Sequence, residues 1–224
     1  MRCVLSLLIL VLPTTVFASP PPSPSALCET AIVGAERTLR LPLRLLGAIA
    51  DVESGRLDAA GHVRPWPWTI NAEGRGQFFA SKQDAIATVR TLQLQGVQSI
   101  DVGCMQVNLM HHPNAFASLD EAFDPTANAL YAARFLNTLY GISGSWVQAT
   151  AAYHSQTPAI GAEYQQRVMA RWQHPGPLFG ATVTQTAYRD FRPNAQVYRA
   201  FQPADRVYGA FDEAAPIPTR LAHR

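Results

Sequence analysis

Lysine is almost absent from this chain: of its 18 basic residues only Lys82 is a lysine, which indicates a GC-rich genome rather than a mechanism. The formal net charge is only +2, so the composition gives no reason to expect nucleic acid as a partner. The sequence also lacks a Gly-rich phosphate loop and a Ser-His-Asp order. No Cys/His cluster has metal-ligand spacing, and the adjacent His111 and His112 would point to different sides. We therefore expect neither a metal nor another cofactor.

Long apolar runs are scarce as well, and the clearest one lies at the N-terminus. Arg2 precedes an apolar run from Cys3 to Val16, and Val16-Phe17-Ala18 has the small residues that precede a signal-peptidase cut. We expect a signal peptide over residues 1–18, cleaved after Ala18, and hence a periplasmic or secreted protein. No other segment could cross a bilayer.

Cysteine is also rare, and removal of the signal would leave only Cys28 and Cys104. An even count in an oxidising compartment predicts a disulfide, and two buried free thiols are the alternative. Closing a loop of that length would stabilise the fold by about 4 kcal/mol in the chain-entropy model. Neither cysteine has a neighbouring His in a nucleophile pattern, so the sequence does not indicate a thiol enzyme.

One acidic residue stands in a helix that should be apolar. Leu45, Leu46, Ile49 and Val52 fall at helical spacing and predict a buried stripe, and Glu53 continues that stripe at the helix end. A carboxyl group on an apolar face costs several kcal/mol unless it is paired or protonated. The raised pKa that follows suits a general acid working near neutral pH. The alternative is an end residue that reaches solvent or an Arg.

The remaining periodicity predicts a mostly helical α+β domain over residues 28–173, with one small β-hairpin. A Pro-rich linker is expected at 19–27. The expected helices run over about 27–38, 41–53, 81–96, 124–141, 145–153 and 160–172. The hairpin is expected to pair 66–71 with 76–79 around a Gly-containing turn. Residues 99–112 are expected to be irregular.

Three motifs appear in a fixed order and at gaps of about fifty residues. Glu53-Ser54 ends a helix, Gly103-Cys104-Met105-Gln106-Val107-Asn108 follows, and Ala151-Ala152-Tyr153-His154 comes last. In this order they resemble the catalytic domain of the soluble lytic transglycosylases, which are lysozyme-like enzymes that cut peptidoglycan. The resemblance covers residues 28–173 and implies a lysozyme-like fold.

The resemblance also implies a mechanism with a single acid/base, which Glu53 matches. The Glu protonates the bond between N-acetylmuramic acid (MurNAc) and N-acetylglucosamine (GlcNAc), and the substrate's own acetamide stabilises the positive centre. The ionised Glu then takes the proton of the C6 hydroxyl, which closes a 1,6-anhydro ring without consuming water.

Further site residues are matched position by position. Ser54 and Gln106 match residues that orient the sugar and its acetamide, and Tyr153 matches a tyrosine whose hydroxyl reaches the catalytic Glu. Each remaining position has an alternative or a less secure match. Met105 is expected under the sugar or in the core, and Asn108 is expected to bind the sugar or the backbone. Tyr153 has a core aromatic as its alternative role, Tyr164 matches a further cleft tyrosine less securely, and His154 stands where the family usually has Asn. Trp66, Trp68 and Phe78 are expected to line the glycan groove or to pack the hairpin.

Two other functions stay open. A hydrolytic muramidase of the same fold would need a second carboxylate. Of Asp51, Asp58, Glu73 and Asp101, only Asp101 is close to the Gln106 motif, and a role in turn geometry is its alternative. A non-catalytic wall-binding scaffold is the second alternative.

Residues 174–224 form a tail with a ten-residue repeat. Tyr188-x-x-Phe191-x-Pro193 recurs at Tyr198 and, without the proline, at Tyr208. The prolines break any continuous helix, so we expect a disordered tail that is either plain low-complexity sequence or a row of docking motifs. The expected partners are peptidoglycan strands and, through the tail, a secretion or flagellar machine. We expect a monomer.

Overall fold

The structure is a computed structural model, and it describes residues 21–174. The expected signal peptide and nearly all of the tail lie outside the described residues. The helices are α1 (Pro24–Leu39), α2 (Leu45–Glu53), α3 (Lys82–Leu94), α4 (Leu119–Ala122), α5 (Pro125–Ser143), α6 (Trp146–His154) and α7 (Pro158–Gln173). The strands are β1 (Gly55–Leu57), β2 (Val63–Pro65), β3 (Thr69–Ala72), β4 (Arg75–Phe78), β5 (Ile100–Val102) and β6 (Val107–Asn108). The mostly helical α+β architecture expected from the sequence is confirmed.

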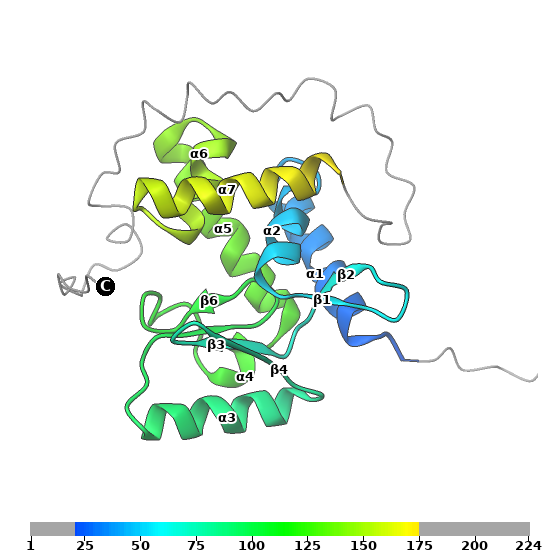
Figure 1. The fold of residues 1–224 in the computed structure, drawn as a ribbon, viewed down its shortest axis with the longest axis vertical. Helices are drawn as coiled ribbons and strands as arrows, with labels where there is room; N and C mark the ends of the chain where they lie inside the picture. The colour runs from blue at the N-terminus through cyan, green and yellow to red at the C-terminus, as the bar shows by residue number, and fades with distance from the viewer. Residues whose placement is uncertain (1–20, 175–224) are drawn as a thin grey trace, which may run out of the picture.

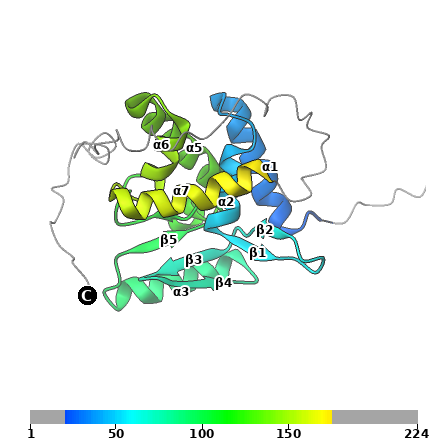
Figure 2. The same cartoon turned by 45° about the horizontal axis from the view of Figure 1, so that its top comes forward.

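The described chain has two cores, one for each half of the fold. Helices α1, α2, α5, α6 and α7 gather in one half, and the four-stranded sheet rests on α3 and α4 in the other (Figure 1). Turning the molecule shows α7 crossing over α2, with the sheet below both (Figure 2). Within residues 21–174, none of the helices combines the length and the apolar character that a membrane span requires.

The expected hairpin is confirmed as β3 and β4, which pair antiparallel around Glu73 and Gly74. Both turn residues have positive φ, 51° and 82°, which is the geometry that two-residue hairpins favour. Strand β5 pairs with the other edge of β3, and β6 pairs with β5. The expectation that 99–112 is irregular was therefore wrong, because strands of two or three residues are too short to show alternation. A separate hairpin joins β1 and β2.

Helix α1 begins earlier than expected, and α2 begins later. The Ser23 hydroxyl accepts from the backbone N–H of Ala26, and Pro24 occupies the first turn, so α1 starts inside the expected linker. Arg40 and Arg44 adopt left-handed φ values of 55° and 68°; Arg40 ends α1, and Arg44 interrupts the helix that was expected from residue 41. The buried Glu36 carboxyl group then accepts from backbone N–H groups at the start of α2. Burial raises the pKa of Glu36 in spite of these hydrogen bonds.

Helices α3, α5 and α6 start where the sequence predicts, whereas α7 starts two residues early, at Pro158, and the short α4 was not expected. The side chains of Ser81, Asp124 and Ser145 each accept a hydrogen bond from a backbone N–H in the first turn. Gly141 does not end α5, which continues to Ser143. Gly144, with a φ of 66°, is its C-cap.

The expected disulfide between Cys28 and Cys104 is present. Cys28 lies on α1 and is fully buried, and Cys104 lies in the turn between β5 and β6. The bridge spans 76 residues of sequence, so it ties the N-terminal helix to the motif that contains Gln106.

Candidate active site

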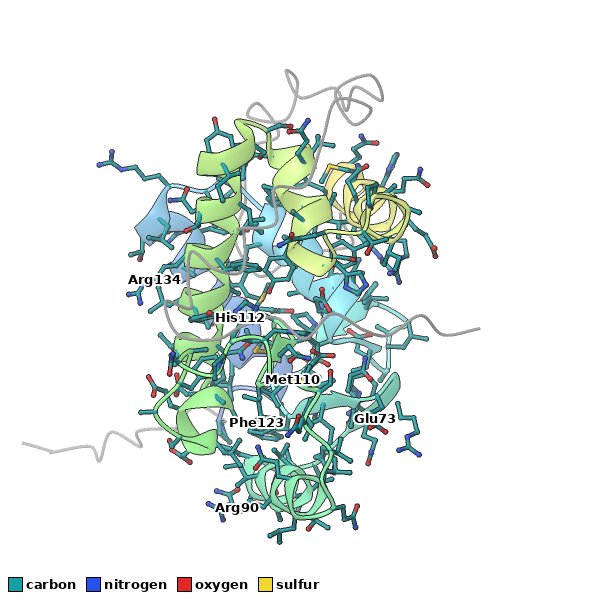
Figure 3. All side chains as sticks on the ribbon, turned by 90° about the vertical axis from the view of Figure 1, so that its left-hand side faces the viewer. Glu73, Arg90, Met110, His112, Phe123 and Arg134 are labelled. Atoms are coloured by element: carbon teal, nitrogen blue, oxygen red, sulfur yellow. A yellow bond between two sulfur atoms is a disulfide. The ribbon has the colours of Figure 1, made fainter. Side chains whose placement is uncertain are left out.

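Glu53 is the last residue of α2, and its side chain lines a cleft where the helical half meets the sheet. The stripe before it is buried as expected, with Leu45, Leu46 and Ile49 fully inside the core. The cleft is lined by residues from α2, the sheet, the segment after β6, and helices α5 and α6: Glu53, Asn71, Asp101, Gln106, Val107, Asn108, His111, His112, Tyr131, Ala132, Phe135, Tyr153 and His154. His112 lies at the junction of the helices and the β region (Figure 3).

The carboxyl group of Glu53 is poised to carry a proton at neutral pH. Burial raises the pKa of Glu53 to about 8, and the charge of Asp101 adds to this rise. A hydrogen bond from Tyr164 and the positive charge of Arg167 work in the opposite direction. A carboxyl group with a pKa near neutral can donate a proton in one step and accept one in the next. This is what a single residue needs in order to act first as a general acid and then as a base.

The tyrosine that holds Glu53 is Tyr164. Its hydroxyl donates to Oε1 of Glu53 over 2.6 Å, and the ring is buried on α7. We expected Tyr153 to make this contact. Tyr153 lines the cleft, but its hydroxyl donates to the backbone carbonyl of Met105 over 2.9 Å, because the last turn of α6 faces the motif after β5. Tyr153 thus supports the segment that carries Gln106.

Gln106 has one fixed orientation. Its side-chain N–H₂ donates to two backbone carbonyls, those of Thr69 at 3.1 Å and Gly103 at 2.9 Å. Because both partners are acceptors, the amide nitrogen must face them and the amide oxygen must face away. The backbone of Gln106 is left-handed, with a φ of 47°. Because its two N–H donors are engaged, the side chain presents a fixed acceptor oxygen to the cleft.

Asn128 on α5 organises the turn before Gln106. Its side-chain oxygen accepts from the backbone N–H of Met105, and its N–H₂ donates to the carbonyls of Val102 and Ala122. Gly103 has a φ of 81°, and a Cβ at this position would lie 2.5 Å from the Asn128 amide. Glycine is thus required both for the backbone conformation and for the close approach.

Two residues that were expected to contact the sugar lie in the protein interior. Ser54 is fully buried, and its hydroxyl donates to the carbonyl of Cys104 over 2.6 Å. Met105 is fully buried in the helical core, so the core alternative holds for it. Ser54 thus joins the end of α2, next to Glu53, to the turn before Gln106.

Three polar residues lie at matching positions across the sheet. Asn71 pairs with Asp101, and Asp101 pairs with Asn108 in the strand register. Asn108 donates to Asp101 over 2.7 Å, and its oxygen accepts from the backbone after β6, so it serves the backbone as well as the cleft. Burial raises the pKa of Asp101.

Several cleft residues were not predicted from the sequence. The side-chain oxygen of Asn71 is buried and has no hydrogen-bond partner among residues 21–174. Alternation along β3 could have identified it, since Asn71 follows the buried Ile70 and must face the other side. The Tyr131 hydroxyl and His112 Nδ1 lie 2.9 Å apart, but no sequence pattern connects these two positions.

Other expected residues lie outside the cleft lining. The indole N–H of Trp66 donates to the carbonyl of Phe79, and its ring packs edge-on against Trp68, contacts of the kind that the packing alternative expects. Phe78 is 47% exposed on the outer strand. Glu73 lies at the edge of the sheet, away from His112 (Figure 3). Across the described part of the chain, no group of three or more His, Cys, Asp or Glu could hold a metal ion.

A match to a known family covers both the helical half and the sheet half of the fold that line this cleft. The family model described as "Transglycosylase SLT domain" matches residues 30–171, which include Glu53, Gln106 and Tyr164. No curated protein and no solved structure matches the chain. The family match spans well over half of the sequence, and it agrees with the helical fold and with the acid in the cleft. The chain belongs to the transglycosylase SLT domain family, within the lysozyme-like superfamily, whose members act on peptidoglycan.

Proposed function

We propose that this protein is a peptidoglycan lytic transglycosylase that cuts the β-1,4 bond between MurNAc and GlcNAc without water. Glu53 is its single acid/base, and 1,6-anhydromuramoyl ends are its products. The observation that carries the proposal is the Glu53 carboxyl group in the cleft, held by the hydroxyl of Tyr164 and with its pKa raised to about 8, mainly by burial.

The two steps require Glu53 in two charge states. In the first step the neutral carboxyl group gives its proton to the glycosidic oxygen as the bond breaks. In the second step the carboxylate accepts the proton of the C6 hydroxyl, whose oxygen attacks C1. The hydrogen bond from Tyr164 stabilises the carboxylate between the steps, so it limits how far burial can raise the pKa.

Recognition of the sugar falls to polar groups with fixed positions. The amide oxygen of Gln106 suits the N–H of an acetamido group, because both of its own N–H donors are engaged. The unpartnered oxygen of Asn71 suits a sugar hydroxyl or N–H, because a buried acceptor without a donor costs free energy that a ligand can recover.

A hydrolytic muramidase is the second candidate, because Asp101 lines the same cleft as Glu53. A second carboxylate could activate a water molecule or stabilise the positive centre. The hydrogen bond from Asn108 and the raised pKa of Asp101 suit a residue that shapes the cleft and raises the pKa of Glu53. A wall-binding scaffold would have no use for a cleft carboxyl group whose pKa is raised to about 8.

Digestion of purified sacculi followed by mass spectrometry separates these candidates. We expect muropeptides lighter by one water than the hydrolytic products. Asp101→Asn should keep most of the activity and still give anhydro ends, with Glu73→Gln as an exposed acidic control. Hydrolytic products, or a loss in Asp101→Asn as large as that in Glu53→Gln, would support the muramidase.

Peptidoglycan lies outside the cytoplasmic membrane, so a peptidoglycan substrate indicates where the protein acts and which partners it meets. We propose that the chain acts outside the cytoplasm, as a monomer, after cleavage of the expected signal near Ala18. Recruitment by a secretion or flagellar machine through residues 174–224 remains a proposal, because all but the first of these residues lie outside the described part of the chain.

Truncation after His174 tests the role proposed for the tail. We expect activity on soluble glycan fragments to stay within about twofold of wild type, since the cleft is lined by residues between Glu53 and His154. Association with the envelope should weaken in fractionation or pull-down, because several weak anchors in series act through avidity. Loss of folding on truncation would show instead that the tail is part of the packed domain.

A further inference from the structure

His154 stacks on the tyrosine that holds the catalytic acid. The ring centroids of His154 and Tyr164 lie 4.5 Å apart with an angle of 8° between the planes. Tyr164 in turn donates to Glu53 over 2.6 Å. The three side chains come from α6, α7 and α2, and they lead from the rim of the cleft to its acid.

The stack covers one face of the Tyr164 ring with a residue that lines the cleft. Tyr164 is buried, whereas His154 is exposed and lines the cleft. A tilt of the tyrosine ring out of its present plane would carry its hydroxyl away from Glu53. A parallel ring over its face blocks this tilt, because the two flat surfaces must stay in contact.

We propose that His154 is a positioning residue whose flat ring keeps the Tyr164 hydroxyl on the carboxyl group of Glu53. This inference rests on the role proposed for Glu53. It assigns a role to position 154, where this chain has His and the resembling enzymes usually have Asn.

The ring, rather than a charge, is what His154 contributes. Desolvation and then the positive charge of Arg167 hold the pKa of His154 below its usual value, and the negative charge of Glu163 opposes them. A lowered pKa favours the uncharged imidazole, so His154 stacks on Tyr164 as a flat aromatic ring. Around Glu53 itself, the groups that influence its charge are Tyr164, Asp101 and Arg167.

Loss of the stack has a predictable direction. The hydrogen bond from Tyr164 lowers the pKa of Glu53, so a loosely held Tyr164 lets that pKa rise above about 8. The carboxylate needed for the second step then becomes a stronger base but is poorly positioned. We expect His154→Ala to lower the rate roughly tenfold through this misplacement.

The experiment compares His154→Ala, His154→Phe and Tyr164→Phe with the double variant His154→Ala/Tyr164→Phe. Two quantities are measured: the pKa of Glu53 by carbon NMR of its carboxyl group, and the rate of anhydro-product formation across pH. Thermal unfolding confirms that each variant is folded, and His174→Ala, an exposed histidine beyond α7, is the matched control.

Three results are expected. His154→Ala raises the pKa of Glu53 and lowers the rate, His154→Phe restores both, and the double variant is no worse than Tyr164→Phe alone. The inference is overturned if His154→Phe behaves like His154→Ala, or if the effects of His154→Ala and Tyr164→Phe multiply. His154→Tyr repeats the aromatic rescue if the Phe variant unfolds.

The NMR titration needs no enzymatic activity. If the wild-type protein fails to cut sacculi, the proposed function fails while the titration still tests the role of His154. If the wild type cuts and the titration shows no shift in His154→Ala, the proposed function stands and the positioning role does not.

Discussion

We expect Glu53→Gln to lower the rate of sacculus digestion by at least about a hundredfold, because the amide keeps the shape of the side chain and cannot transfer a proton. Tyr164 can still donate to the remaining side-chain oxygen, so the cleft should keep its geometry. The measurement is release of soluble muropeptides at pH 7. Near wild-type release would rule out Glu53 as the acid.

The same variant has a second, independent signature in stability. The pKa of Glu53 rises from 4.5 to about 8 on folding, so the unfolded state loses this proton first and wild-type stability falls as pH rises through that interval. The amide side chain of the variant has no such proton to lose. The Glu53→Gln protein should therefore gain stability relative to wild type from pH 5 to pH 9 in urea unfolding, whereas the exposed Glu73→Gln control should not.

Removing the disulfide should have the largest effect on folding. For Cys28→Ala/Cys104→Ala, a loop of 76 residues predicts a loss of about 4 kcal/mol, or roughly 10 °C in Tm. The catalytic rate should fall as well, because Cys104 lies two residues before Gln106 and its carbonyl accepts from Ser54.

Reduction of the wild-type protein is the matched experiment for the disulfide. A reducing agent should lower the wild-type Tm by a similar amount and leave that of the double variant unchanged. An equal Tm for oxidised wild type and the double variant would show that the bridge contributes nothing to stability. Thiol titration of the denatured, unreduced protein should detect no free cysteine in mature material.

Sequence alone predicted most helices because their signals are local. Ser81, Asp124 and Ser145 are recognisable as N-caps, and the apolar spacing before Glu53 predicts a buried helix. The interruption at Arg44 could not be predicted, since it depends on Glu36, eight residues earlier, turning its carboxyl group onto the next helix.

The sequence predicted which motifs form the candidate site, but it did not predict which side chains contact one another there. Glu53 was identified from its place on an apolar helix stripe and then from the resemblance, and Gln106 from the resemblance. The exchange of roles between Tyr153 and Tyr164 was not predictable, because it depends on how α6 and α7 pack over α2. The need for glycine at position 55 could not be predicted either, because it arises from a close approach: a Cβ there would lie 2.1 Å from the carbonyl oxygen of Asp51.

The buried amide of Asn128 has a consequence for the thermodynamics of substrate binding. It fixes the backbone on both sides of Gly103 through hydrogen bonds to Met105, Val102 and Ala122. The turn that carries Gln106 therefore loses its conformational entropy during folding and loses little more when a glycan arrives. A flexible turn would lose this entropy at every binding event. We therefore expect the affinity for a glycan to depend in part on Asn128, a side chain of α5 that lies outside the cleft lining.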